Sequence, residues 1–150
     1  MSLTTNQAVL DFVADSAALT NPDRIVWITG DESQLEELRA EACRTGELIK
    51  LNEEKLPGCY YHRSAVNDVA RVEARTFICS REKENAGPTN NWMAPADAYA
   101  LTRGILKDSM KGRTMYVIPY SMGPVTSPFA KFGIEITDSI YVVVSMAIMT

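Results

Sequence analysis

The feature of this 150-residue sequence that most constrains its fold is a helix-like segment between two strand-like runs near the N-terminus. Residues 25–28 are Ile-Val-Trp-Ile, and this short apolar run rich in β-branched side chains predicts a buried strand. Residues 31–45 place apolar side chains at helical spacing, and residues 48–51 return to a strand pattern. We expect this order to form a βαβ unit in an α/β domain.

The two helices expected in this half have definable ends. The first covers residues 5–19, with Thr5 as its N-cap, and the second begins at Asp31 and ends at Gly46. The apolar stripe of the first helix is Val9, Leu10, Phe12, Val13 and Ala17, and that of the second is Leu35, Leu38, Ala42 and Cys43.

The second half continues the alternation of short strands and helices. Residues 67–74 predict a short helix or turn, 76–79 a strand, 80–94 a polar loop, 113–120 a strand that ends at Pro119, and 134–137 another strand. Between them, residues 95–109 predict a helix with Pro95 at its first position. Its buried side is expected to comprise Ala98, Leu101, Ile105 and Leu106. Because no repeat or linker divides the chain, we expect residues 1–150 to form a single domain.

Composition excludes several classes of partner. The chain has 15 basic and 19 acidic residues, so no basic excess indicates a nucleic acid or an anionic membrane. Its longest apolar run, at residues 141–144, is far shorter than the roughly 20 residues that span a bilayer. The first 18 residues lack the basic region of a signal peptide.

The three cysteines, Cys43, Cys59 and Cys79, lie far apart, and the only histidine is His62. An odd number of widely spaced cysteines predicts reduced thiols and a cytoplasmic location. A zinc site needs about four clustered ligands, which this spacing does not favour.

The most specific indication of function is a series of sequence blocks between residues 67 and 150. In order they read NDVARVE (67–73), RTFICS (75–80), AGPTNNW (86–92), GRTMYVIPYSMGP (112–124), GIEITDS (133–139) and SMAIMT (145–150). This series resembles the N-terminal region of the GTP-dependent phosphoenolpyruvate carboxykinases of bacterial type. The resemblance is strong over residues 67–150 and loose over residues 1–66.

The resemblance implies an α/β fold with a mixed β-sheet flanked by helices. It also implies an enzyme that converts oxaloacetate and GTP to phosphoenolpyruvate, GDP and carbon dioxide in gluconeogenesis. The family uses manganese together with magnesium on the nucleotide. Residues 1–150 would then be its N-terminal, substrate-side domain, and the chain would end before the nucleotide- and metal-binding domain.

One functional residue of the family maps onto this chain. Arg71 matches the arginine that binds the substrate carboxylate, and its planar guanidinium suits bidentate contact with that group. The alternative is a surface arginine paired with Asp68 or Glu73. No catalytic, cofactor-binding or metal-binding residue is expected, because G-x-x-x-x-G-K-[ST] is absent and the family's metal ligands lie beyond Thr150. We therefore expect the isolated 150-residue chain to bind no cofactor and to be inactive.

The sequence also departs from the family pattern. Ala147 stands in place of a usual arginine, Ile140 in place of a proline and Thr126 in place of a glycine. Loss of the proline weakens a helix start. The alternatives are a stand-alone module that binds carboxylates or a partner chain without catalysis, and a structural or regulatory protein that has kept only the fold.

The last segment, residues 139–150, gives conflicting signals. Its β-branched and aromatic residues favour a strand, whereas the family resemblance implies a helix. We predict a helix that is capped by Asp138 or Ser139 and continues past residue 150. Exposed Met146, Ile148 and Met149 would then favour self-association.

Overall fold

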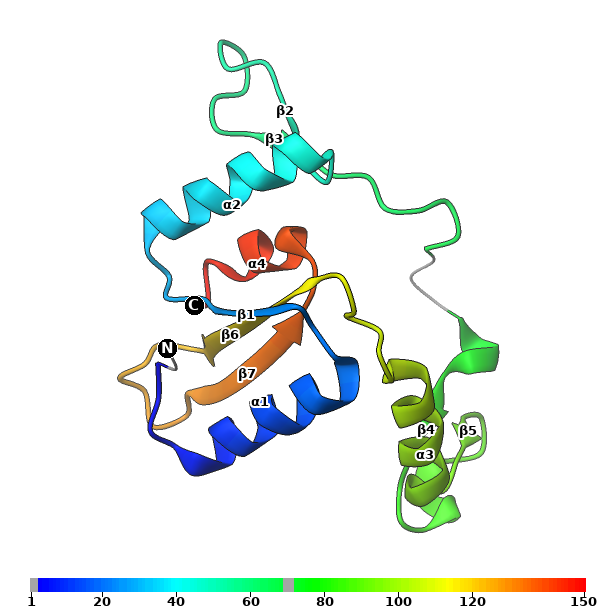
Figure 1. The fold of residues 1–150 in the computed structure, drawn as a ribbon. Coiled ribbons are helices and arrows are strands. Elements are labelled where there is room, and N and C mark those ends of the chain that lie inside the picture. The colour runs from blue at the N-terminus through cyan, green and yellow to red at the C-terminus, as the bar shows by residue number, and fades with distance from the viewer. Residues whose placement is uncertain (1–2, 69–71) are drawn as a thin grey trace.

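The structure is a computed structural model that describes residues 3–68 and 72–150. Its largest part, which we call the sheet body, is built on a mixed three-stranded sheet in the order β1-β6-β7 (Figure 1). Strand β1 runs parallel to β6, and β6 runs antiparallel to β7. The strands are β1 (Arg24–Trp27), β6 (Thr114–Met122) and β7 (Lys131–Thr137). The predicted α/β class with a mixed sheet and flanking helices is confirmed.

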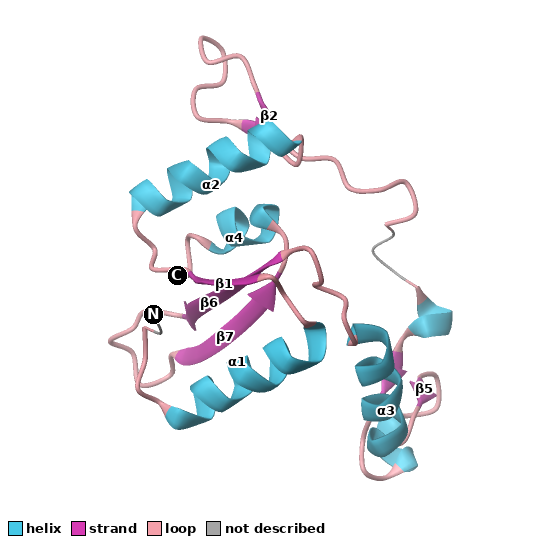
Figure 2. Ribbon diagram, in the orientation of Figure 1, coloured by secondary structure: helices cyan, strands magenta, loops and turns pink. Residues whose placement is uncertain are grey.

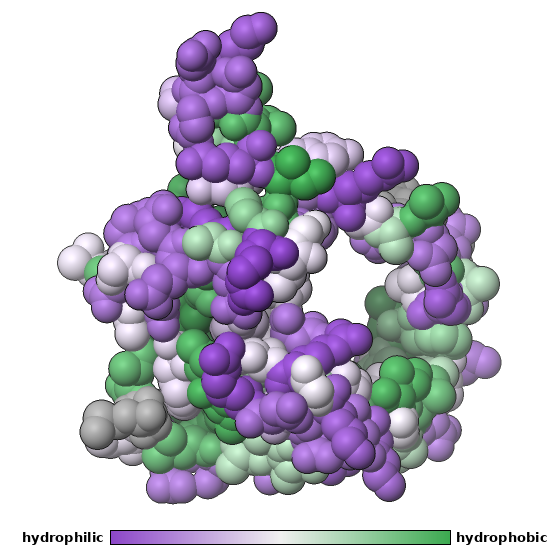
Figure 3. Space-filling view, turned by 45° about the horizontal axis from the view of Figure 1, so that its top comes forward, coloured by the Kyte–Doolittle hydropathy of each residue, from purple (hydrophilic) through white to green (hydrophobic). Residues whose placement is uncertain are grey.

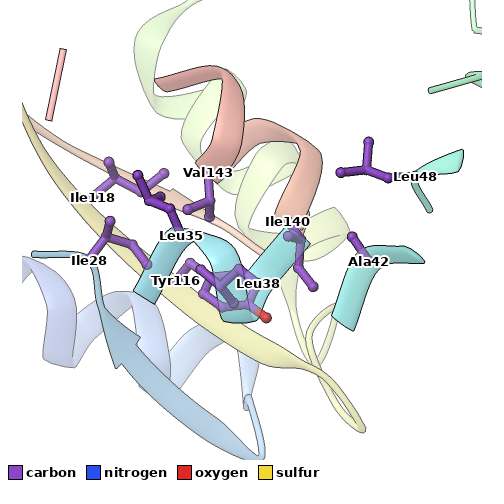
Figure 4. Packing of buried hydrophobic residues seen from close by; sticks show 9 residues of the cluster. All are labelled: Ile28, Leu35, Leu38, Ala42, Leu48, Tyr116, Ile118, Ile140 and Val143. Carbon is purple, nitrogen blue, oxygen red and sulfur yellow. The ribbon is translucent and has the colours of Figure 1, made fainter. Parts of the chain in front are cut away.

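Helices cover both faces of this sheet (Figure 2). Helix α1 (Gln7–Thr20) lies on one face, and α2 (Glu32–Thr45) and α4 (Ile140–Met146) lie on the other. Successive β6 side chains point to opposite faces, so Met115 and Val117 join the cluster with α1. Tyr116 and Ile118 join the larger cluster beneath α2 and α4 (Figure 4). Four consecutive buried residues in β6 follow from this double cover.

The expected course of α2 is confirmed, and that of α1 is confirmed with a shifted start. Asp31 is the α2 N-cap, and Gly46 ends the helix with a φ of 83°. Asn6, and not Thr5, caps α1, because its side chain accepts the Ala8 N–H at 3.0 Å. Of the α1 stripe only Val13 is buried. The α2 residues that are buried are Leu35, Leu38 and Ala42.

The predicted βαβ unit is wrong. Strand β2 (Ile49–Lys50) pairs antiparallel with β3 (Tyr60–Tyr61) in a separate hairpin, and the parallel neighbour of β1 is β6. Leu48 explains the departure, because its side chain enters the core and its N–H bonds to the Ala42 carbonyl at 3.0 Å. This contact holds the chain against the end of α2, and the next residues leave the sheet body. Strand β1 is consequently an edge strand, and Ile25 is 43% exposed instead of buried.

Strand β6 does not end at Pro119, as expected from the sequence, but continues to Met122. The last β1 partner is Trp27, which faces Val117, so β1 is not beside Pro119. Ser121 donates its N–H to the Met149 carbonyl at 2.9 Å, away from β7. The backbone N–H groups of residues two apart in a strand point to the same edge, so an N–H at position 119 would also point away from β7. The proline therefore removes no hydrogen bond between β6 and β7.

The C-terminal segment is helical, as predicted, and Ser139 is its N-cap through a 3.4 Å bond from the Val142 N–H. The expectation that the helix continues past residue 150 is wrong, because α4 ends at Met146. The Met149 carbonyl bonds instead to β6. The expected patch is only partly exposed, since Met146 and Met149 are half-buried whereas Ile148 is 92% exposed.

Residues 72–106 form a second part, which we call the lateral lobe (Figure 1). It holds a two-stranded parallel ribbon and one α-helix. Its elements are η1 (Glu73–Arg75), β4 (Phe77–Ile78), η2 (Lys83–Ala86), β5 (Asn91–Trp92) and α3 (Pro95–Leu106). Residues 80–94 are therefore not only loop, because η2 and β5 lie within them.

Helix α3 begins with Pro95 at its first turn, as predicted, but its predicted buried side is wrong. Leu101 is 51% exposed, Ile105 69% and Leu106 44%, whereas Ala98 is half-buried. The β4–β5 ribbon is only two residues long in each strand and is too small to cover a 12-residue helix. Figure 3 shows apolar surface on this lobe and an opening between the lobe and the sheet body.

Candidate functional site

Arg71, the residue predicted to bind substrate, lies outside the described residues. Its suggested ion-pair partners are described, and both Asp68 and Glu73 are exposed. The Asp68 N–H bonds to the Ala65 carbonyl at 2.9 Å, which closes a turn that runs into the start of the NDVARVE motif. The candidate site is therefore built from the residues that follow Arg71 and from those that hold them.

A tight turn begins directly after Arg71. The Val72 carbonyl accepts the Arg75 N–H at 3.0 Å and the Thr76 hydroxyl at 2.8 Å. The Thr76 N–H in turn bonds to the Glu73 carbonyl at 3.2 Å. A threonine hydroxyl that bonds back to a carbonyl four residues earlier is a common local device. Together with the Arg75 N–H, the Thr76 hydroxyl gives the Val72 carbonyl two hydrogen-bond donors.

Asn91 holds the same turn from a distance in sequence. Its Nδ2 donates to the Glu73 carbonyl at 2.9 Å and to the Thr76 carbonyl at 3.2 Å. A carboxamide has two N–H donors, so it can make both bonds at once. The side chain thus closes η1 across its two ends.

The ribbon fixes where Asn91 stands. In the parallel register Phe77 faces Asn91 and Ile78 faces Trp92. The Met93 N–H bonds to the Ile78 carbonyl at 3.2 Å. The Trp92 indole N–H donates to the Ser80 carbonyl at 3.0 Å, which ties the exit of β4 to β5.

An open cavity of about 520 Å³ lies beside this ribbon. Its lining residues are Lys83, Glu84, Ala86, Gly87, Pro88, Asn90 and Trp92. The Asn90 Nδ2 and the Trp92 indole N–H already bond to the Ala86 and Ser80 carbonyls. The lysine and the glutamate carry opposite charges. We therefore assign no ligand to this cavity.

Displaced pKa values occur at four groups of the sheet body and its β2–β3 hairpin. A hydrogen bond with Glu53 raises the pKa of Lys50, and the same bond lowers the pKa of Glu53. Glu32 and Glu36 hold Arg39 and raise the pKa of its guanidinium. These are exposed or half-exposed ion pairs, which contribute little to stability.

The fourth group is Tyr116, whose pKa is raised by its burial in the core. Its ring belongs to the cluster beneath α2 and α4, and the residue is 3% exposed. This shift therefore reflects packing in the sheet body and not a reactive position.

His62 and Glu47 join the β2–β3 hairpin to the start of α4. The His62 Nδ1 donates to the Glu47 carbonyl at 2.7 Å, and its ring stacks on Tyr141 with 4.1 Å between centroids. The Glu47 carboxylate accepts the Ser139 hydroxyl at 2.6 Å and the Tyr141 N–H at 2.9 Å. The only histidine is thus engaged in a structural contact.

The described part of the chain does not bring metal ligands together. Among residues 3–68 and 72–150, no three His, Cys, Asp or Glu side chains gather so that they could hold a metal ion. The three cysteines are unpaired, with Cys43 half-buried and Cys59 and Cys79 exposed. Within the same residues, no helix has the length and apolar character needed to cross a membrane.

The fold and the turn after Arg71 define an α/β domain with a hydrogen-bonded lobe beside its sheet. The sequence profile of the family described as "Phosphoenolpyruvate carboxykinase N-terminal domain" matches residues 11–150. This chain therefore belongs to the phosphoenolpyruvate carboxykinase N-terminal domain family.

Its relatives carry a consistent name. The protein "Phosphoenolpyruvate carboxykinase [GTP]" of Anaeromyxobacter sp. (strain K) is 55% identical over 146 residues, which cover 97% of this chain and 24% of the relative. The protein of the same name from Corynebacterium kroppenstedtii is 52% identical over 147 residues, which cover 98% of this chain and 24% of the relative. The chain thus spans about a quarter of the length of the relatives it matches.

Sequence reasoning missed two structural contacts near these segments. Asn91 lies in the AGPTNNW block, but nothing in the block indicates that its carboxamide reaches Glu73 and Thr76. Glu47 follows Gly46, and no local pattern indicates that it bonds to the start of α4. Both contacts depend on tertiary structure, and no signal in the sequence could have identified the partners.

Proposed function

We propose that this chain forms the N-terminal, substrate-side part of a bacterial-type GTP-dependent phosphoenolpyruvate carboxykinase. The whole enzyme would convert oxaloacetate and GTP to phosphoenolpyruvate, GDP and carbon dioxide, a lyase reaction of gluconeogenesis. The observation that carries the proposal is the match of residues 11–150 to the family profile, together with relatives of about half-identical sequence that are named for this activity. The three unpaired thiols support a cytoplasmic location.

Arg71 is proposed to bind the carboxylate of oxaloacetate and phosphoenolpyruvate. Both molecules are anionic, and a guanidinium fork can hold a carboxylate through two parallel hydrogen bonds. The position within NDVARVE supports this role. The tightly bonded turn from Val72 to Thr76 supports it further, because it anchors the chain directly after Arg71.

GTP, manganese and magnesium are proposed as cofactors of the whole enzyme. Bound metals would offset negative charge on the enolate and phosphoryl oxygens. The described residues do not fit these groups, because they assemble no metal-ligand cluster, and the sequence lacks a G-x-x-x-x-G-K-[ST] loop. No step of the reaction is therefore assigned to a metal held by this chain.

The direct test replaces Arg71 in the full-length enzyme. Arg71→Ala should raise KM for oxaloacetate and phosphoenolpyruvate by about 10- to 100-fold, since a charged hydrogen-bonded contact is lost. KM for GTP should change by less than about twofold. Arg75→Ala is the matched control, because Arg75 is exposed in the same turn. Equal effects of the two substitutions, or unchanged substrate KM in Arg71→Ala, would refute the role of Arg71.

A second test concerns the polypeptide limited to residues 1–150. We expect no phosphoenolpyruvate formation from oxaloacetate, GTP and manganese above the rate with metal alone. The described residues supply neither a phosphate loop nor metal ligands. Turnover clearly above that background would overturn this expectation.

The alternative is a non-catalytic module that binds a carboxylate or a partner chain, including a second copy of itself. The exposed apolar side chains of α3 and of Ile148 favour such an interaction. Self-association through the C-terminal segment predicts concentration-dependent light scattering that Ile148→Lys abolishes. A monomer at high concentration, with or without this substitution, would exclude self-association.

A further inference from the structure

We propose that Asn91 is a positioning residue for substrate binding, because its carboxamide fixes the turn that follows Arg71. The inference rests on the proposed role of Arg71. The observation behind it is a single side chain that reaches two carbonyls, 18 and 15 residues earlier in the chain. Those carbonyls belong to Glu73 and Thr76, at the start of the turn and just past its end.

The first step is the effect of the two bonds on the backbone. Asn91 Nδ2 lies 2.9 Å from the Glu73 carbonyl oxygen and 3.2 Å from that of Thr76. Two acceptors three residues apart are thereby held by one planar amide. The turn cannot open or rotate without breaking at least one of these bonds.

The second step transmits this restraint toward Arg71. The Thr76 hydroxyl and the Arg75 N–H both bond to the Val72 carbonyl, at 2.8 Å and 3.0 Å. Val72 is covalently joined to Arg71. In the sequence, the proposed substrate-binding arginine is therefore followed directly by a residue whose carbonyl is held by two hydrogen bonds.

The third step concerns Asn91 itself. It faces Phe77 in the β4–β5 register, and its neighbour Trp92 donates its indole N–H to the Ser80 carbonyl. The Trp92 ring is half-buried. Asn91 thus projects from a strand that pairs with β4 and is tied to the exit of β4 by the Trp92 indole, and it supports the turn from this strand.

The exposure of these groups separates positioning from stability. Glu73, Thr76 and Asn91 are all exposed, so carbonyls that lose Asn91 can bond to water instead. Loss of the carboxamide should therefore change the stability of the enzyme very little. It should nevertheless allow more conformations of the turn, and bidentate contact with a carboxylate is sensitive to such displacement.

The test uses the full-length enzyme with Asn91→Ala. KM for oxaloacetate and phosphoenolpyruvate should rise by about tenfold, whereas KM for GTP should stay within about twofold. Asn90→Ala is the matched control, because its Nδ2 bonds to the Ala86 carbonyl at 2.7 Å in the same loop but does not reach the turn. The control should leave substrate KM unchanged, and both variants should keep the melting temperature of the parent enzyme.

A double-mutant cycle shows whether Asn91 acts through Arg71. In the Arg71→Ala background, Asn91→Ala should add no further rise in substrate KM. A full additional rise would overturn the positioning role. If Asn91→Ala does not fold, Thr76→Val decides, since it removes the bond to the Val72 carbonyl and should raise the same KM by about threefold.

The outcomes also separate this inference from the proposed function. If Arg71→Ala raises substrate KM and Asn91→Ala does not, the positioning role is wrong and the function stands. If neither substitution changes substrate KM, the role of Arg71 and the positioning role both fail.

Discussion

The sheet body and the lateral lobe are held together in different ways. Among the residues that the structure describes, the buried hydrophobic side chains lie in the sheet body or directly against it, with Ala86 as the one exception in the lobe. In the lobe, side chains bond to backbone carbonyls instead, as Thr76, Asn90, Asn91 and Trp92 do. The body is thus stabilised by apolar burial, and the lobe is shaped by directional hydrogen bonds.

This difference teaches how one short chain can combine a stable scaffold with a positioned segment. Apolar burial is non-directional and contributes most of the stability of a domain. Hydrogen bonds in exposed regions contribute little net free energy but restrict geometry. The segment that follows Arg71 lies in the lateral lobe, where hydrogen bonds restrict the backbone geometry and Ala86 is the one described hydrophobic residue that is buried.

The largest expected effect compares two isoleucines. Ile118→Ala should lower the free energy of unfolding by about 2–5 kcal/mol, because the Ile118 side chain is fully buried in the cluster beneath α2 and α4. Ile105→Ala in α3 should change it by less than about 0.5 kcal/mol, because that side chain is 69% exposed. Urea denaturation of both variants measures the contrast. A loss above about 1 kcal/mol for Ile105→Ala would show that α3 is covered in solution.

What the sequence could predict depends on whether the signal for a feature is local. The ends and buried side of α2 were predictable, because caps and helical spacing are local signals. Strand β7 and the helical state of the last segment were also predicted, the latter from the family resemblance. The partner of β1 was not predictable, because it pairs with β6 about ninety residues later and no local signal specifies it.

Other misses have the same cause. Helical spacing shows that α3 has an apolar side, but it does not show whether another element covers that side. The effect of Pro119 depends on which side of β6 needs an N–H, and this is a property of the sheet. At the candidate site, the proposed role of Arg71 comes from the sequence motif, whereas the two Asn91 bonds to backbone carbonyls depend on tertiary structure that the motif does not specify.

The second prediction compares two glycines and expects opposite signs. A Cβ at Gly133 would lie 2.6 Å from the Tyr120 ring across the β6–β7 pair, whereas one at Gly104 in α3 would meet nothing within 4 Å. Gly133→Ala should lower the free energy of unfolding by about 1–3 kcal/mol, because the Tyr120 ring must move. Gly104→Ala should raise the free energy of unfolding by about 0.5–1 kcal/mol, because alanine favours a helix more than glycine does. Thermal unfolding gives both values.

Tyr120 supplies the control for the Gly133 argument. In a Tyr120→Ala background the ring is gone, so Gly133→Ala should cost much less than it does alone. An unchanged cost would mean that the penalty arises from the backbone of β7 and not from the ring.

The third prediction concerns a polar contact within the sheet body. Glu47→Ala should cost about 1–2 kcal/mol, since its carboxylate accepts both the Ser139 hydroxyl and the Tyr141 N–H at the start of α4. Glu84→Ala, an exposed glutamate of the lateral lobe, should change stability by less than about 0.5 kcal/mol. Chemical denaturation compares the two. Equal effects would break the distinction between contacts that join elements of the body and charges on the lobe.

The smallest expected effect appears only at alkaline pH. Burial raises the pKa of Tyr116, so its phenol stays neutral in the folded chain while it ionises from about pH 10 in the unfolded chain. Ionisation of the phenol therefore stabilises the unfolded chain from about pH 10 upward. The contribution of Tyr116 to the free energy of unfolding is fully present below about pH 10 and is lost as the pH rises toward its folded pKa. Tyr116→Phe should make the loss of unfolding free energy above about pH 10 less steep. Tyr99→Phe is the matched control, because that ring in α3 is 71% exposed. The same slope in both variants would contradict the assignment of this pH dependence to the buried phenol of the sheet body.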